Sequence, residues 1–135
     1  IKPYLKCMPL IGNGDLDSPE KVVEAFRRYP VDGVMIARAC LGRPWLFQQA
    51  AAALRGEPIP PEPTLAEQKD ALLHHFNMVL QHYEEKRAVG YFRKFAAGYT
   101  RLHPKRKTVL LAFMAANTKQ EVYDLVQQWY SDHTD

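Results

Sequence analysis

A proline-rich segment divides this chain of 135 residues into two halves with different hydrophobic patterns. Four prolines fall within the six residues from Pro58 to Pro63. Such a segment cannot continue a helix and favours extended backbone, so we interpret residues 57–63 as a stiff connector. The sequence therefore predicts two domains, residues 1–56 and residues 64–135.

The first half alternates between short apolar runs and helical patterns. Residues 8–11 and 33–37 are apolar runs bordered by glycine, a pattern typical of buried parallel strands. A helical pattern follows each run, the first capped by Ser18 and the second ended by Gly56. This βαβα order predicts an α/β domain with two parallel strands. Because two strands cannot form a covered sheet, and because the chain begins at Ile1, we expect it to be a piece of a longer polypeptide.

The second half has only helical patterns. Residues 64–67 and 118–121 both read Thr-x-x-Glu, the capping box that opens a helix. Two further helices are expected at about residues 88–101 and 108–115 from their apolar periodicity. The sequence therefore predicts an all-α second domain, an antiparallel helical bundle.

Two turns in the first half carry residues that suit a phosphate group. Gly12-Asn13-Gly14-Asp15 follows the first predicted strand, and Ala37-Arg38 ends the second. Glycines permit close approach of a ligand to backbone amides, and an arginine fork binds phosphate in a bidentate manner. In barrels of alternating strands and helices, phosphate sites commonly form at successive strand ends of this kind. Two plainer interpretations stay open: a tight turn without a ligand, and a structural ion pair of Arg38 with Asp15 or Asp32.

The charge distribution indicates a polyanionic partner, although the net charge is only +3. No acidic residue occurs between Glu85 and Glu121, a window that contains nine cations. The alternative is a solvated helical face whose carboxylates lie elsewhere in space. The nine cations of this basic segment are Lys86, Arg87, Arg93, Lys94, Arg101, Lys105, Arg106, Lys107 and Lys119.

Three motifs in the first half and one in the second resemble the tRNA-dihydrouridine synthases, particularly the bacterial B-type branch. The motifs are residues 9–15 (PLIGNGD), 32–39 (DGVMIARA), 41–47 (LGRPWLF) and 91–94 (YFRK). The resemblance covers nearly the whole chain but only the C-terminal part of the family's usual length. It implies the last two βα units of a TIM-type (β/α)8 barrel, followed by the family's helical domain.

The resemblance also implies a cofactor and a reaction. Family members bind FMN, use NADPH as the reductant, and reduce uridine to 5,6-dihydrouridine in tRNA. Two cysteines do not make a disulfide framework in a chain of this length, so the expected location is the reducing cytoplasm. The FMN-binding positions carried over are Asn13, Gly14, Asp15, Ala37 and Arg38, with Ala37 replacing the usual glycine. The family's catalytic cysteine loop does not occur in this sequence, so we assign no catalytic residue and expect this segment alone to be inactive. Cys7 and Cys40 are interpreted as small buried side chains.

The expected tRNA contacts lie in the second half. Arg93 and Lys94 correspond to an Arg-Lys element of the family's helical domain, and the cations after them suit contacts with the RNA backbone. The tRNA-binding residues that we predict are Arg93, Lys94, Arg101, Lys105, Arg106 and Lys107. Three aromatic residues, Tyr91, Phe95 and Tyr99, are expected either to stack on unpaired bases or to pack inside the bundle.

Several functions find no support in the sequence. No histidine pair on the helix that contains His74, His75 and His82 has the i, i+4 spacing of a metal site, so we predict no metal and solvated histidines. No apolar run reaches the length of a membrane span, and we expect no membrane partner. One alternative function stays open, a non-catalytic basic helical module that binds nucleic acid beside a barrel remnant. Another flavin- or phosphate-binding barrel enzyme is a third hypothesis, which leaves the basic segment unexplained.

Overall fold

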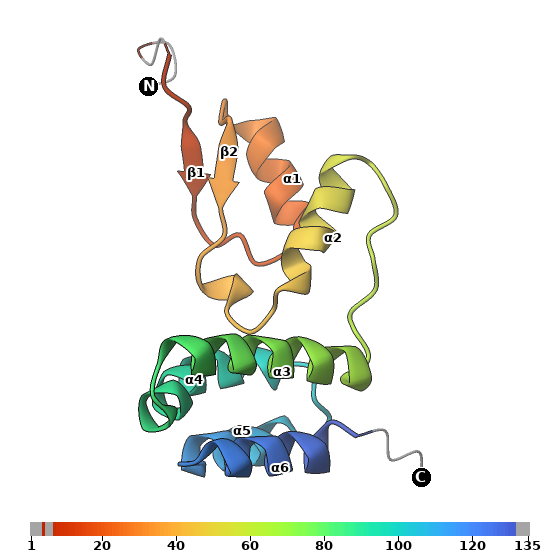
Figure 1. The fold of residues 1–135 in the computed structure, drawn as a ribbon. Coiled ribbons are helices and arrows are strands. Elements are labelled where there is room, and N and C mark those ends of the chain that lie inside the picture. The colour runs from red at the N-terminus through yellow and green to blue at the C-terminus, as the bar shows by residue number, and fades with distance from the viewer. Residues whose placement is uncertain (1–3, 5–6, 132–135) are drawn as a thin grey trace. The chain divides into compact units, whose positions relative to one another are not determined.

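The computed structural model describes residue 4 and residues 7–131, which divide into two compact units, Ile1–Glu62 and Pro63–Asp135. The described part of the first unit contains two short strands and two helices, joined by short loops and a 3-10 helix (Figure 1). Its elements are β1 (Ile11–Asn13), α1 (Pro19–Arg28), β2 (Gly33–Met35), the 3-10 helix η2 (Arg38–Cys40) and α2 (Trp45–Leu54). The second unit is helical: α3 (Leu65–His82), α4 (Glu85–Tyr99), α5 (Arg106–Ala115) and α6 (Lys119–Trp129).

The strands β1 and β2 pair in parallel, with Ile11 opposite Gly33 and Asn13 opposite Met35. Asp32 fixes the start of this pairing, because its carboxylate accepts a hydrogen bond from the Leu10 amide at 2.7 Å. The Asp32 amide in turn donates to the Leu10 carbonyl at 2.8 Å. The order of elements and the parallel direction confirm the predicted βαβα pattern. Strand β1 nevertheless begins at the end of the apolar run and includes part of the predicted turn, because pairing with β2 defines the strand rather than side-chain polarity.

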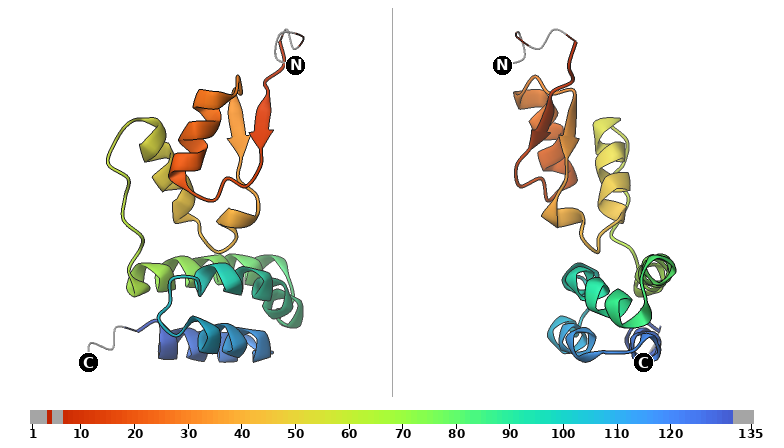
Figure 2. Two further views of the ribbon diagram at one scale, coloured as in Figure 1. Left: turned by 180° about the vertical axis from the view of Figure 1, so that it is seen from behind. Right: turned by 60° about the vertical axis from the view of Figure 1, so that its left-hand side comes forward.

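The prediction that both strands are buried is wrong for this chain. Ile11 is 55% exposed and Met35 is 49% exposed, although both belong to the apolar runs that predicted the strands. Figures 1 and 2 show why: α1 lies beside β2 and α2 lies beside α1, so these two helices cover only part of a two-stranded sheet. An apolar sequence predicts burial only where a neighbouring element supplies the cover.

The two helices of the first unit supply most of its core. Ser18 caps α1 as predicted, with its hydroxyl accepting a hydrogen bond from the Lys21 amide at 3.4 Å. Val22 of α1 and Leu46 of α2 are almost completely buried, and the two helices pack against each other. Gly56 ends α2 in a left-handed conformation with φ +70°, as its position after the helical pattern predicts.

The proline-rich connector packs along α2. The buried guanidinium group of Arg43 donates to the Glu62 carboxylate at 3.1 Å. The buried Gln49 amide of α2 donates to the Pro60 carbonyl at 3.1 Å. These contacts place residues up to Glu62 in the first unit, and the division between units falls just before Pro63.

The four helices of the second unit share one apolar core. Each capping box forms as predicted: Thr64 and Thr118 each accept a hydrogen bond from the amide of the glutamate three residues later, and each glutamate bonds back to the threonine amide. Helix α4 begins three residues earlier than expected, at Glu85, and ends at Tyr99, while α5 begins at Arg106. The largest completely buried side chains of this core are Leu72, Phe76, Val89, Phe92, Tyr99, Val109, Phe113, Val126 and Tyr130.

Two histidines correct the expectation of solvated imidazoles. His103 is 6% exposed, and its Nε2 lies 2.7 Å from the Trp129 carbonyl while its Nδ1 accepts from the Lys105 amide at 3.0 Å. These two bonds require the proton on Nε2. His75 is half-buried, and its Nδ1 lies 3.1 Å from the hydroxyl of the buried Tyr99. Sequence periodicity did not reveal either contact because each partner lies more than 20 residues away.

Candidate phosphate and nucleic-acid sites

The chain turns sharply where β1 ends. Gly14 has φ +150° and Asp15 has φ +43°, so two successive residues adopt backbone conformations that side chains rarely permit. A Cβ at Gly14 would meet no heavy atom within 4 Å. Glycine is therefore required here by the backbone conformation, and it leaves open space beside the main chain.

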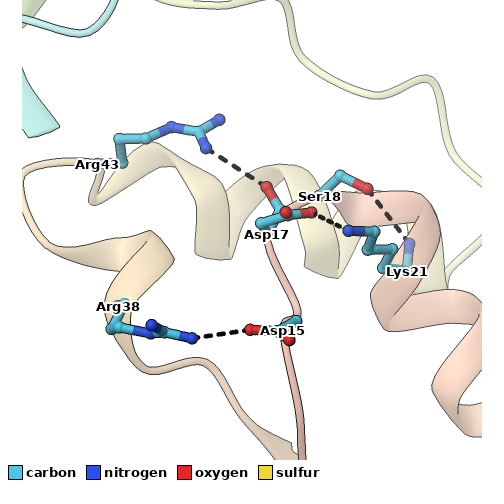
Figure 3. Close-up of polar contacts among 6 residues, drawn as sticks. All are labelled: Asp15, Asp17, Ser18, Lys21, Arg38 and Arg43. Atoms are coloured by element: carbon cyan, nitrogen blue, oxygen red, sulfur yellow. Dashed lines mark hydrogen bonds and ion pairs between the residues drawn. The ribbon is translucent and has the colours of Figure 1, made fainter.

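The turns after β1 and β2 meet through one ion pair. The Arg38 guanidinium contacts the Asp15 carboxylate at 2.9 Å, and both side chains are largely exposed (Figure 3). This contact is the ion pair that the sequence left open as the plainer interpretation. It also shows that Arg38 points toward the Asn13–Asp15 turn, as a shared phosphate site requires. The geometry follows from parallel pairing, which brings the carboxyl ends of β1 and β2 to the same edge.

A hollow of about 610 Å³ lies beside the first of these turns. Asn13, Gly14 and Asp15 line it together with residues of α1, including Lys21 and Arg28. Neither Ala37 nor Arg38 lines this hollow. The five predicted FMN-binding residues thus belong to two adjoining turns, but only three of them form this hollow.

The residues present fit a phosphate group at the meeting point of the two turns. Arg38 uses one of its terminal nitrogens for Asp15, and the exposed guanidinium retains other N–H donors. Ala37 has φ −99°, which lies outside the left-handed region that favours glycine. The Asp15 carboxylate repels a phosphate, and the remaining N–H donors of Arg38 attract one.

Contacts that the sequence did not predict hold the segment between β1 and α1. The Lys21 ammonium lies 2.8 Å from the Asp17 carboxylate, and this hydrogen bond raises the pKa of Lys21 (Figure 3). The Arg43 guanidinium donates to the Asp17 carbonyl at 3.4 Å. Arg43 therefore connects this segment to the Glu62 end of the connector. No local motif signals this role, because its two partners lie 19 and 26 residues away.

The two cysteines differ from the sequence-based interpretation. Cys7 is exposed, so the expectation of burial is wrong for this residue. Cys40 is half-buried, and its thiol donates to the Ala37 carbonyl at 3.0 Å. Cys40 thus stabilises the turn after β2 instead of filling a core position.

Arg93 and Lys94 of α4 have separate surroundings in the second unit. The Arg93 guanidinium donates to the Ala116 carbonyl at 2.6 Å and to the Asn117 side chain at 3.1 Å. Because Ala116 caps α5, this cation stabilises the negative end of a helix. The Lys94 ammonium instead lies 3.5 Å from the centre of the exposed Tyr91 ring. Lys94 is therefore available to a ligand, whereas Arg93 already has a structural role.

The remaining predicted tRNA contacts lie in and just after the loop between α4 and α5. Arg101, Lys105, Arg106 and Lys107 are exposed there. The buried His103 joins this loop to the end of α6, and the Lys105 ammonium lies 5.5 Å from the Trp129 ring centre. The loop is thus held in place by contacts that leave its cations at the surface.

Most of the basic segment remains free of carboxylates. Among the described residues, Lys119 alone of its nine cations forms an ion pair, with Glu85 at 3.9 Å. The other eight cations have no carboxylate within 4.0 Å among these residues. The structure therefore leaves a net positive surface on the second unit, which suits a polyanion.

Membrane-spanning helices and metal clusters are both absent from the part of the chain that the structure describes. No helix there is long and apolar enough to cross a membrane. Among the same residues, no group of three or more histidine, cysteine, aspartate or glutamate side chains gathers in a way that could hold a metal ion.

Comparison with known proteins identifies relatives along almost the entire chain. Residues 1–134 match the family model described as dihydrouridine synthase (Dus). The chain is 33% identical to a probable tRNA-dihydrouridine synthase of Mycobacterium tuberculosis over 90% of its own length and 31% of that protein. It is 35% identical to tRNA-dihydrouridine synthase B of Xanthomonas campestris over 96% of its length and 39% of the relative. The corresponding protein of Vibrio cholerae is 31% identical over 93% of this chain and 39% of the relative.

The chain thus spans between three and four tenths of the length of these curated relatives. The match extends through both structural units, from the turns that follow β1 and β2 to the basic segment of α4 and α5. With the family model covering nearly every residue, the chain belongs to the dihydrouridine synthase family.

Proposed function

We propose that this chain is a segment of an FMN-dependent tRNA-dihydrouridine synthase, an oxidoreductase that reduces uridine to 5,6-dihydrouridine in tRNA with NADPH. The first unit, as the last two βα units of a (β/α)8 barrel, contributes the phosphate end of the FMN site. The second unit contributes a tRNA-binding surface. The proposal rests on the family match and, within the structure, on the contact between Arg38 and Asp15 that joins the two strand-end turns.

Arg38 has the chemistry to hold the FMN phosphate. Its ion pair with Asp15 is exposed, and exposed pairs contribute only about 0–1 kcal/mol. A guanidinium forms two charge-assisted hydrogen bonds with a phosphate dianion, which are stronger than that pair. The open backbone at Gly14 lets the anion approach the turn, and the Asn13 side chain adds a hydrogen-bonding group there. FMN, when bound, supplies the hydride chemistry, and the residues described here bind and orient its phosphate end.

The FMN proposal is tested by titrating this chain with FMN and following the quenching of flavin fluorescence. We expect Arg38→Ala to weaken binding about tenfold or more, because it removes about one to two charge-assisted hydrogen bonds. Arg55→Ala is the matched control, because Arg55 also forms an exposed ion pair in the first unit, with Glu57 at 2.6 Å. Equal affinities for the two variants would show that Arg38 does not bind the phosphate.

The tRNA surface is tested by the salt dependence of RNA binding. Charge reversal at Lys94 or Arg101 is expected to weaken tRNA binding and to reduce the slope of log K against log salt by about 1 for each phosphate that is no longer bound. Arg93 is unsuitable for this test, since its reversal would also break the hydrogen bond with Ala116. An unchanged slope for Lys94→Glu and Arg101→Glu would exclude these two cations as phosphate-binding groups.

One observation favours the alternative function, a non-catalytic nucleic-acid-binding module. Arg38 already has a partner in Asp15, so this ion pair is complete without a cofactor. A chain that binds tRNA with a normal salt dependence but does not quench FMN fluorescence would be a non-catalytic nucleic-acid-binding module. The two titrations together separate this function from the oxidoreductase segment.

A further inference from the structure

One surface of α4 combines cations and aromatic rings in a way that the proposed phosphate contacts do not explain. The Lys94 ammonium lies 3.5 Å from the centre of the Tyr91 ring and 4.9 Å from the centre of the Phe95 ring. Tyr91 in turn lies 5.1 Å from the Tyr83 ring, with only 35° between the two ring planes. The Arg87 guanidinium lies 4.8 Å from the Tyr83 ring centre. We call these five residues the cation–aromatic stripe.

The stripe follows from the helical repeat. Arg87, Tyr91 and Lys94 occupy positions i, i+4 and i+7 of α4, which place three side chains on one face of a helix. Tyr83, just before α4, adds its ring to the same face through its contact with Tyr91. The two cations are therefore two helical turns apart, about 10 Å along the axis, with aromatic rings between them.

Core packing accounts for Phe95, whose ring centre lies 4.4 Å from that of the half-buried His75, but it does not account for Tyr91. The core of the second unit takes Phe92 and Tyr99 from α4, both almost completely buried, whereas Tyr91 is 37% exposed. Neither Arg87 nor Lys94 forms an ion pair with any described residue. The stripe thus presents ring surface and uncompensated charge to the outside, the two features that nucleic-acid-binding proteins combine to hold unpaired nucleotides.

We propose that the stripe is a binding site for an unpaired nucleotide of RNA, with the base stacked on Tyr91 and the adjacent phosphates held by Arg87 and Lys94. In the free protein the Lys94 ammonium covers the Tyr91 ring. Stacking of a base is the stronger interaction at an exposed ring, so an incoming base displaces the ammonium, which then pairs with a phosphate. This inference rests on the proposed function, because it assigns a further contact to the same RNA-binding surface.

The charge of the surroundings favours RNA over a protein ligand. The stripe overlaps the segment from Lys86 to Lys119, which contains nine cations and no carboxylate side chain. Single-stranded RNA offers phosphates that pair with the cations and unpaired bases that stack on the rings. Duplex RNA keeps its bases stacked on one another and offers only its phosphates. The site therefore discriminates between unpaired and paired RNA of equal charge.

The test compares binding of this chain to a labelled single-stranded RNA and to a duplex of the same length, by fluorescence anisotropy at several salt concentrations. We expect Tyr91→Leu to weaken single-strand binding about 5- to 100-fold, the effect of removing one stacked base, and to leave duplex binding nearly unchanged. Tyr91→Phe keeps the ring and should bind with nearly the affinity of the unchanged chain. Tyr29→Leu is the matched control, because Tyr29 is exposed and lies 5.5 Å from the Arg28 guanidinium, but in the first unit.

The outcomes separate this inference from the proposed function. Tyr91→Leu should retain the salt slope, since it removes no cation. Single-strand binding of Tyr91→Leu equal to that of the unchanged chain, or an equal weakening on the duplex, overturns the stacking site while leaving the phosphate contacts in place. Salt slopes unaffected by Lys94→Glu and Arg101→Glu overturn the phosphate contacts instead. A folded Tyr91→Phe variant that binds as weakly as Tyr91→Leu also overturns the stacking site, because its ring is intact.

Discussion

His103 is expected to be one of the most sensitive positions in the second unit. Its imidazole lies between the loop that precedes α5 and the end of α6, with one hydrogen bond to each. The ring also contacts Tyr130 edge-on, with ring centres 5.1 Å apart. Replacement by alanine removes all three interactions and leaves the Lys105 amide and the Trp129 carbonyl without their partner.

The expected destabilisation follows from these interactions. Each hydrogen bond contributes about 1 kcal/mol, and the edge-on ring contact contributes about 1 kcal/mol more. His103→Ala should therefore lower the free energy of unfolding of the second unit by about 3 kcal/mol. For a domain of this size that corresponds to a fall in Tm of about 15 °C, measured by scanning calorimetry. His82→Ala, at an exposed position of α3, should change the free energy of unfolding by less than about 0.5 kcal/mol.

Two further variants divide the effect between the two hydrogen bonds. His103→Gln places an amide donor near the position of Nε2 and should regain part of the bond to the Trp129 carbonyl. His103→Asn places an acceptor near the position of Nδ1 and should regain part of the bond to the Lys105 amide. A Tm for His103→Ala no lower than that of His82→Ala would refute the contacts assigned to His103.

Two further predictions concern backbone conformation and pH. Gly14→Ala should destabilise the first unit by about 1 kcal/mol because of the positive φ, whereas Gly90→Ala, inside α4, should stabilise the second unit by about 0.5–1 kcal/mol. A Cβ at either position meets open space, so the two variants differ only in backbone conformation. If urea unfolding showed that both substitutions change the free energy of unfolding in the same direction, the positive φ of Gly14 would not be the cause. Burial is the main reason that the pKa of His75 is lower than its ordinary value of 6.5, and the positive charge of Lys94 lowers this pKa further. The folded state favours the neutral form of His75. Its contribution to the free energy of unfolding is therefore complete above pH 6.5 and is lost as the pH falls below that value. His75→Phe should flatten the fall in stability between about pH 7.5 and about pH 5, and an unchanged pH profile would count against this assignment.

The sequence predicted those features that depend on residues close together in the chain. The capping boxes at Thr64 and Thr118 formed as expected, because a threonine and a glutamate three residues later interact within one turn of helix. The Ser18 cap and the Gly56 helix end belong to the same class. The parallel pairing of the two strands also followed from the alternation of strand and helix.

The candidate phosphate site was predictable in outline only. Parallel strand order is sufficient to bring the turns containing Asp15 and Arg38 to one edge, and the structure places them in contact. The pairing of these two side chains with each other could not be decided in advance, since Asp32 was an equally reasonable partner. In the structure the Asp32 carboxylate accepts a hydrogen bond from the Leu10 amide, and Arg38 pairs with Asp15.

The residues proposed to bind tRNA show the same division. The lack of acidic residues across the basic segment is a property of the sequence, and it predicts a positive charge there. From the sequence, the same role, tRNA binding, was predicted for Arg93 and Lys94. The fold separates them, because successive residues of a helix point about 100° apart, and it directs Arg93 to the end of α5 and Lys94 to the Tyr91 ring.

By itself, the sequence determined the order of the elements, four capped helix ends, the charge of the second unit and the family, because short-range contacts and residue type carry that information. Only the tertiary structure decided which side chains are covered. Ile11 and Met35 are apolar yet exposed, whereas His103 and Arg43 are polar yet buried. Burial depends on partners that arrive from distant parts of the chain, and a polar group enters the interior where those partners supply hydrogen bonds to it.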